Sequence, residues 1–308
     1  MKPKKRDNYK LTGSIHTMQI KSEYPCINEP DNRITTCLIK NGEEAKSIIN
    51  PNRNGDIFSF MQLKSVMEEI LKSAYIDEYR IIRADLRLDS YESKHYKEYS
   101  KLNKYLISAL AIEYSVENDY RACNLWTDKQ VSLAIKNEYL EVENYDRSYK
   151  NTVLHDDDKA KARLEERTKA KQWRTHNSLQ MCDNEKNMQM LEKEFVIIWG
   201  KRWKKAIRSE NLKAVQDKYN DALAQEYFDG LNAYPVQFRS LTDFLIQNQK
   251  RIFTTRQMVS LLRRIGIENA EDRAKYHKKK YGIEYFSQAD VKHAVKEIER
   301  ATRAFFES

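Results

Sequence analysis

The 308-residue chain is poor in the residues that break secondary structure and cross-link a fold. It contains seven glycines, five prolines and four cysteines. The cysteines lie far apart and form no C-x-x-C pair, which argues against a zinc knuckle or a disulfide framework and favours reduced thiols. Because glycine and proline are scarce, element boundaries have to be taken from hydrophobic periodicity and polar clusters.

Several sequence features of membrane proteins and common enzymes are also missing. No apolar run approaches the ~20 residues of a membrane-spanning helix, and no apolar segment follows the basic start, so we expect a cytoplasmic protein. Gly200-Lys-Arg202 lacks the other residues of a phosphate-binding loop, and neither G-x-S-x-G nor H-E-x-x-H occurs. The six histidines form no His-x-His pair. A metal site would therefore use carboxylates, which favours Mg²⁺ or Mn²⁺ over zinc.

Positive charge is in excess, and it is concentrated at the C-terminal end. The formal net charge is +9, and residues 201–308 hold 22 Lys and Arg against 14 Asp and Glu. Clustered bases favour a polyanionic partner, most simply DNA. The alternative is a basic surface that is merely solvated.

Hydrophobic periodicity predicts an α+β fold followed by helices. The polar stretch 168–187 is typical of a linker. We therefore expect a basic disordered tail over residues 1–12, an α+β domain with a mixed or antiparallel sheet and two packed helices over 13–175, and a mostly helical domain over 185–308. The expected strands are 14–20, 33–39, 79–89, 131–136, 138–147 and 163–167, with a turn at Asn137, and the expected helices of the α+β domain are 58–73 and 99–114.

The helical part has signals for several helices. Apolar residues recur at helical spacing over 191–207, Thr254–Gln257 begins a helix that ends near Gly266, and Ser287–Asp290 resembles a capping box. The basic segment Arg273–Lys280 lies between the last two helices. This arrangement suits a helix-turn-helix-like DNA-binding module, and a purely structural bundle is the alternative. The expected DNA-binding residues are Arg263, Arg264, Arg273, Lys275, Lys278, Lys279 and Lys280.

Three short segments are rich in charged residues, Arg83–Asp89, Glu141–Arg147 and Ala162–Arg167, and the first two alternate polar with apolar positions. In an extended strand, alternate side chains point to opposite faces, so the charged residues would line one face of a sheet. Carboxylates, a tyrosine and guanidinium groups on one face suit chemistry on a phosphodiester. The simpler interpretation is an exposed sheet face with cross-strand ion pairs.

Spacing limits how these acids can share a metal ion. Asp85 and Asp89 would lie ~13 Å apart along a straight strand. Both would reach one ion only if the strand bends or bulges, with a further acid from a neighbouring strand, for which Glu165 is the best candidate. Tyr145 is one of nineteen tyrosines, and a tyrosine beside charged residues is more often an amphipathic surface residue than a nucleophile.

The order of these segments resembles the trans-acting replication initiators of Gram-positive rolling-circle plasmids, the Rep_trans-like nicking and joining enzymes. The patterns R-x-D-L-x-x-D, N-Y-[DN]-[RK] and R-[LV]-E-x-[ER] occur in this order at Arg83–Asp89, Asn144–Arg147 and Arg163–Arg167. The resemblance covers roughly residues 55–170 and implies that Tyr145 is the nucleophile. It also implies that the metal ligands are Asp85, Asp89 and Glu165.

Two departures from the family pattern bear on the site. Asp146 and Arg147 stand where the family has Asn and Lys, and Tyr149 lies four residues beyond Tyr145 and competes for the nucleophile's role. The family's DNA-reading segment has no counterpart that aligns here.

The resemblance implies a replication initiator of a plasmid or mobile element, a metal-dependent single-strand DNA endonuclease and strand transferase. Tyr145 would attack the origin strand in line, with Arg147, Lys150 or Arg163 stabilising the added negative charge. The products would be a 5′-phosphotyrosine and a 3′-hydroxyl primer. Expected partners are origin DNA, a host helicase, a polymerase and a second copy in a homodimer. The alternatives are a conjugative relaxase with the same chemistry and a non-enzymatic DNA-binding protein of replication or regulation.

Overall fold

The computed structural model describes residues 10–26, 33–38, 44–53, 57, 59–91, 96–115, 133–137, 140–146, 162–169, 180–233, 235, 237–281 and 285–308. Within this part of the chain, seven strands form one antiparallel sheet in the order β2-β3-β1-β4-β7-β6-β5. The strands are β1 (Thr12–Ser22), β2 (Ile34–Leu38), β3 (Ala45–Ile49), β4 (Tyr79–Ser90), β5 (Leu133–Lys136), β6 (Leu140–Asp146) and β7 (Ala162–Lys169). The helices are α1 (Phe60–Ser73), α2 (Tyr96–Glu113), α5 (Asn184–Glu192), the π-helix η3 (Lys193–Trp199), α6 (Gly200–Ala206), α7 (Ser209–Asn232), α8 (Leu241–Gln247), the 3₁₀ turn η4 (Gln249–Arg251), α9 (Thr255–Arg264), α10 (Ala270–Tyr281) and α11 (Gln288–Phe306).

The structure confirms the α+β class and the strands and helices expected in the first half of the chain. The hairpin between β5 and β6 turns at Asn137, whose side-chain oxygen accepts a hydrogen bond from the Leu140 amide at 2.8 Å. Strand β3 was not predicted. No helix in the described part of the chain is long and apolar enough to cross a membrane.

Local signals account for where the capped helices begin. Ser59 caps α1 through a reciprocal capping box with Gln62, and Ser287 does the same for α11 with Asp290, as predicted. Thr254 caps α9 as expected. Gly266 follows α9 with a φ of 85°, which L-residues rarely adopt, so glycine suits this helix end.

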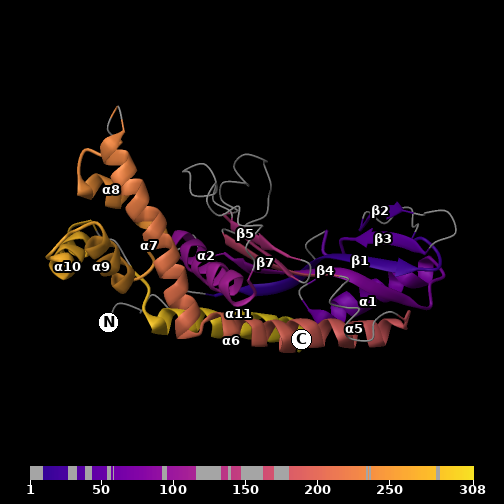
Figure 1. Ribbon diagram of the computed structural model, residues 1–308. Coiled ribbons are helices and arrows are strands. Elements are labelled where there is room, and N and C mark those ends of the chain that lie inside the picture. The colour runs from indigo at the N-terminus through magenta and orange to yellow at the C-terminus, as the bar shows by residue number, and fades with distance from the viewer. Residues whose placement is uncertain are drawn as a thin grey trace.

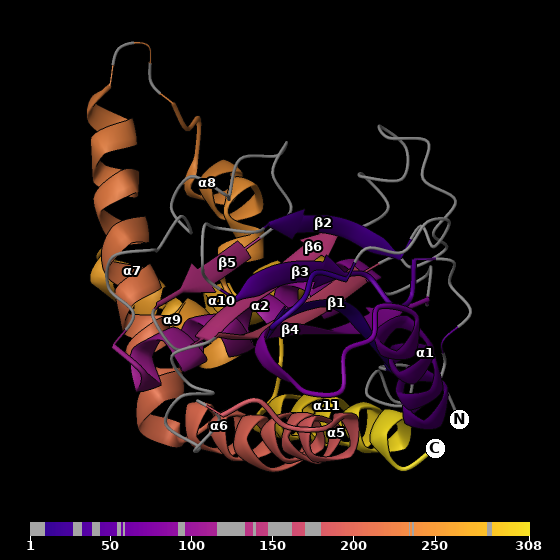
Figure 2. The same ribbon diagram turned by 90° about the vertical axis from the view of Figure 1, so that its right-hand side faces the viewer.

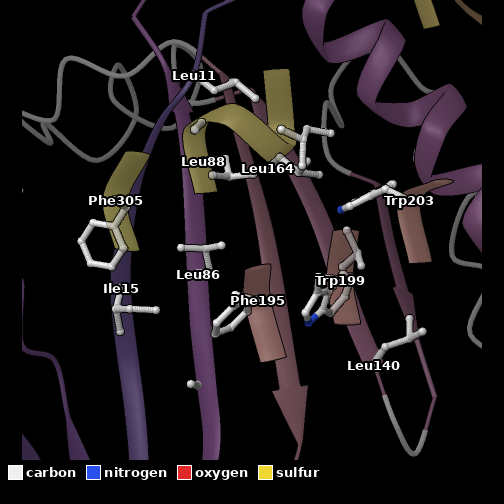
Figure 3. Packing of buried hydrophobic residues seen from close by; sticks show 14 of the residues in the cluster. Leu11, Ile15, Leu86, Leu88, Leu140, Leu164, Phe195, Trp199, Trp203 and Phe305 are labelled. Carbon is white, nitrogen blue, oxygen red and sulfur yellow. The ribbon is translucent and has the colours of Figure 1, made fainter. Parts of the chain in front are cut away.

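One face of the sheet is apolar and is covered by helices. Figures 1 and 2 show α5, α6 and α11 running beneath the sheet, and the main core joins both layers. Figure 3 shows Phe195 beside Leu86 of β4, with Trp199 and Trp203 farther across the sheet toward Leu140 of β6. Side chains from distant parts of the chain therefore bury one another between sheet and helices.

A second, smaller core lies away from the sheet. It contains residues of the distal half of α7 and of α8, α9 and α10, from Leu223 to Ala274. Figure 1 shows α7 extending from the helical layer to this group. The break between cores therefore does not fall between residues 175 and 185, where the domain boundary was expected, because α5, η3, α6 and α11 belong to the main core.

Two segments expected to be irregular are partly ordered. Leu11, placed in the expected N-terminal tail, is buried, and its amide donates to Glu297 Oε1 at 2.9 Å. Thr168 belongs to β7, and Cys182 forms a β-bridge with Tyr79 inside the expected linker. Residues 1–9 and 170–179 lie outside the described residues.

Glu166 interrupts the apolar face of β7. Its side chain is fully buried, Oε1 accepts a hydrogen bond from Trp203 Nε1, and Oε2 has no hydrogen-bond partner among the described residues. It lines a cavity with Trp199, Glu299 and Thr302 that has room for about one water molecule. Burial raises the pKa of Glu166 to about 8, so the acid is mostly protonated at neutral pH.

Candidate functional site

The three charged segments form three adjacent strands. β7 lies between β4 and β6, and its residues pair with both neighbours. Arg167 lies opposite Asp85 on β4 and Glu141 on β6, and Arg163 lies opposite Asp89 and Tyr145. Directly paired residues project to the same side of a sheet, so this register gathers the charges on the face away from the helices. We call it the ion-paired face, and it comprises Arg83, Asp85, Arg87, Asp89, Glu141, Glu143, Arg163, Glu165, Arg167 and Lys169.

The two aspartates of β4 are each held by an arginine. Arg83 donates Nε and Nη2 to the two oxygens of Asp85, both at 2.8 Å. Arg163 donates to both oxygens of Asp89, at 2.6 and 3.0 Å. Each aspartate thus makes the two-pronged contact that matches a guanidinium to a carboxylate.

Arg167 links acids on three strands. Its Nη2 donates to Glu165 Oε2 at 2.8 Å, its Nη1 lies 3.2 Å from Glu143 Oε2, and its Nε lies 3.6 Å from Asp85 Oδ2. It also donates to Glu141. Asp85 and Glu165, expected to hold one metal ion, are therefore brought together around a shared guanidinium.

The ion-paired face is largely shielded from water, unlike the exposed face of the simpler interpretation. Asp85 and Asp89 are each 2% exposed, and Glu165 is 4% exposed. Burial raises the pKa of Asp85, and Arg83 counteracts this through its hydrogen bonds and charge. Burial also acts to raise the pKa of Glu141, but Arg167 and Lys169 bring it below its usual value. The charges are stable here because nearly every buried acid is bonded to a base.

His16 joins this site and was not predicted. The β1–β4 register shifts between Ile15 and Thr17, and at this irregularity His16 Nδ1 lies 3.7 Å from Glu165 Oε1. Burial, opposed by Glu165 and assisted by Arg87, lowers the pKa of His16 to about 4, so the imidazole is neutral at pH 7. In the sequence, the polar residues Ser14 and His16 flank the apolar Ile15, and this alternation is the pattern that could have indicated the placement of His16.

The proposed nucleophile and its neighbours are only partly described. The backbone of Tyr145 lies in β6 opposite Arg163. Arg147, Tyr149 and Lys150 lie outside the described residues. The structure thus places the Tyr145 backbone one strand away from the arginine that holds Asp89.

A divalent metal requires several carboxylate or other oxygen ligands that are available to coordinate it. Asp85, Asp89 and Glu165 are each bonded to a guanidinium group. Among the described residues, no group of three or more His, Cys, Asp or Glu side chains is gathered as a metal site. As arranged, these carboxylates fit a set of ion pairs rather than a metal centre.

The expected DNA-binding bases lie on α9 and α10, and the basic segment that was expected between two helices is itself helical. Figure 1 shows this pair at the end of the molecule away from the sheet. Three of the bases have acidic partners: Arg263 bonds to Glu271, Arg264 bonds to acids of α7, and Lys275 lies 3.5 Å from Asp272. The exposed bases without such a partner among the described residues are Arg273, Lys278, Lys279 and Lys280.

No protein family matches the chain, and no curated protein matches it at a significant level.

Proposed function

We propose that the chain is a DNA replication initiator that nicks one strand at an origin and later rejoins it. The observation that supports this proposal is the adjacency of β4, β7 and β6. It brings Asp85, Asp89, Arg163 and Glu165 to one face and sets the backbone of Tyr145 opposite Arg163.

In the proposed reaction, the Tyr145 hydroxyl loses its proton and its oxygen attacks the scissile phosphorus. A phosphorus–oxygen bond to tyrosine forms and the bond to the 3′ oxygen breaks. That oxygen takes up a proton and leaves as a 3′-hydroxyl, which balances the proton lost by the tyrosine. Arg163, together with Arg147 or Lys150, stabilises the negative charge that develops on the phosphate. The covalent intermediate conserves the bond energy, so reversal rejoins the strand without a nucleotide cofactor.

Metal dependence is a separate part of the proposal. Asp85, Asp89 and Glu165 would hold Mg²⁺ or Mn²⁺ only after displacement of the guanidinium groups that are bonded to them, and the ion would then supply positive charge to polarise the scissile phosphate. A helicase and a polymerase of the host would act on the nicked product. A conjugative relaxase would use the same chemistry on a transfer origin.

A nicking assay tests this proposal. Supercoiled plasmid carrying the DNA that flanks the coding sequence is incubated with full-length protein and Mn²⁺, Mg²⁺ or EDTA. We expect open circles and a protein-linked 5′ end with metal, and neither with EDTA. Tyr145→Phe should reduce nicking more than about a thousandfold while binding to the same DNA is retained.

Tyr149→Phe is the matched control. If that variant loses nicking and Tyr145→Phe does not, the nucleophile is misassigned. If wild-type protein binds the plasmid but never opens it, the enzymatic proposal is wrong.

A second candidate function is a non-catalytic DNA-binding protein. The observation that favours it is that Asp85, Asp89 and Glu165 are already bonded to guanidinium groups. In that case the ion-paired face only stabilises the sheet, and DNA contacts come from α9 and α10. The plasmid assay separates the two candidates because only the first predicts a broken phosphodiester.

A further inference from the structure

One flank of α10 combines two bases with an exposed aromatic ring. The helix buries Ala270, Ala274 and His277 in the second core. Arg273, Tyr276 and Lys280 follow one another at spacings of three and four residues, so they share a single flank beside that buried stripe. We call this the Tyr276 flank.

Tyr276 is one of several large side chains that are exposed. It is 46% exposed, and the Lys280 ammonium lies 5.2 Å from its ring centroid. The same ammonium lies 5.3 Å from the ring of Tyr281. Interaction with the hydroxyl groups of both tyrosines raises the pKa of Lys280, so this group stays charged at neutral pH.

The two bases of the flank, like Lys278 and Lys279 beside them, have no acidic partner among the described residues. Arg273 and Lys280 are exposed and form no ion pair with a described residue, whereas Arg263 and Lys275 are paired on the same two helices. They lie seven positions apart in the helix, which is about 10 Å along the axis, with Tyr276 between them. Two separated cations around an exposed ring match phosphates on either side of a base.

The acidic start of α10 disfavours the usual docking of a recognition helix on duplex DNA. Such a helix contacts base edges with its N-terminal residues, and here the first turn carries Glu271 and Asp272, which phosphates would repel. In a duplex, the faces of the bases are also stacked on one another. An exposed tyrosine gains most from bases that are unpaired.

We propose that the Tyr276 flank binds single-stranded DNA, with a base stacked on Tyr276 and phosphates bound to Arg273 and Lys280. This inference rests on the proposed function, in which nicking at an origin releases an unpaired strand. The Tyr276 flank would bind the strand that becomes unpaired after nicking, and it is separate from the ion-paired face.

Binding of a labelled oligodeoxythymidine of about 20 nucleotides to the full chain, followed by fluorescence anisotropy, tests the proposal. Tyr276→Ala should weaken binding about tenfold or more, because stacking on an aromatic side chain is lost. Tyr276→Phe keeps the ring and should bind like wild type. Tyr75→Ala is the matched control, since Tyr75 is 88% exposed and lies far along the chain, after α1.

The salt dependence of oligonucleotide binding tests the roles of Arg273 and Lys280. Arg273→Gln and Lys280→Gln should each lower the slope of log affinity against log salt by about 0.7 for a single strand. Unchanged affinity in Tyr276→Ala, equal weakening in Tyr276→Phe, or tighter binding of a duplex of the same length would overturn the proposal.

The two proposals fail in different ways. A chain that binds the oligonucleotide through Tyr276 but never nicks plasmid refutes the initiator chemistry and leaves this surface in place. A chain that nicks plasmid while Tyr276→Ala binds normally refutes this surface alone.

Discussion

Glu166 shows how strongly the two faces of one strand can differ. Glu165 and Arg167, its neighbours in sequence, belong to the ion-paired face, whereas Glu166 lies under the helices and accepts a hydrogen bond from Trp203. No base among the described residues is bonded to it, so burial dominates its titration and raises its pKa to about 8. Nearby Arg202 partly counteracts this increase, and Glu194 adds to it.

The raised pKa of Glu166 predicts that the protein loses stability as pH rises. The unfolded chain releases this proton near pH 4.5, whereas the folded chain keeps it up to about pH 8. The contribution to the free energy of unfolding is therefore fully present below about pH 4.5 and falls by roughly 1.4 kcal/mol per pH unit until the folded pKa is passed. Urea unfolding of wild type and Glu166→Gln between about pH 5 and 9 measures it.

Glutamine keeps an oxygen for Trp203 and carries no proton to lose. Glu166→Gln should therefore match wild type near pH 5 and exceed it in stability near pH 9. Glu268→Gln, at an exposed site, is the control and should follow wild type throughout. If the free energies of unfolding of wild type and Glu166→Gln change with pH in parallel, Glu166 does not titrate in this range.

The pairing of particular acids with particular bases on the ion-paired face could not be predicted from the sequence. Alternation correctly predicted that Asp85 and Arg87 share a face, because period two is a local property of a strand. The role of Arg167 depends on register between strands that lie far apart in the chain. A slip of two residues would keep Arg167 on the same face but set it opposite other side chains, and alternation alone does not distinguish that register from the observed one.

At the scale of single elements, the ends of helices were the features that the sequence predicted best. Capping residues act through bonds to backbone amides three residues away, so the signal and the structure are both local. Strand β3 was missed because Ala45–Ile49 is short and its partners are β1 and β2. The sequence predicts a basic connection over Arg273–Lys280 because the charged residues obscure the short buried stripe of α10.

Loss of the α11 capping box should destabilise the whole protein. Ser287→Ala removes the oxygen that accepts from the Asp290 amide at 3.2 Å and the hydroxyl that donates to the Asp290 carboxylate. We expect a decrease of about 1 kcal/mol in the free energy of unfolding, measured by urea titration. The loss should be global because α11 contributes Val291, Ile298 and Phe305 to the main core.

Ser209→Ala is the matched control for this variant. Ser209 is exposed and lies in the first turn of α7, but Arg208 is the N-cap residue there and no side-chain cap bond is present. Equal losses in the two variants would contradict the capping explanation.

For the whole molecule, the main surprise is that one core includes residues as far apart in the chain as Leu11 and Phe306. The apolar stripe through Trp199 and Phe195 was correctly predicted as buried, but a stripe does not reveal what it packs against. Its partner is the sheet, and Phe305 and Phe306 complete the layer. Phe60 of α1 also packs against both of these rings, with centroids 6.3 and 4.8 Å apart.

A fragment ending at residue 175 should therefore not fold alone. It would expose the apolar face that α5, η3, α6 and α11 cover, and single domains need that buried area to offset chain entropy. We expect no cooperative thermal transition by circular dichroism, whereas the full chain shows one. Co-expression with residues 176–308 should restore the transition. A cooperative transition of the fragment by itself would show that the expected boundary is a folding boundary after all.

The shared guanidinium of Arg167 has a consequence for how ligands would act on the ion-paired face. An anion that draws Arg167 away leaves Asp85 and Glu165 without their common base, and those carboxylates then attract a cation more strongly. Equally, a cation bound to Asp85 and Glu165 leaves Arg167 available to an anion, because two binding equilibria that share one group are reciprocal. Anion and cation binding at this face are thus linked thermodynamically, and each should raise the apparent affinity of the other.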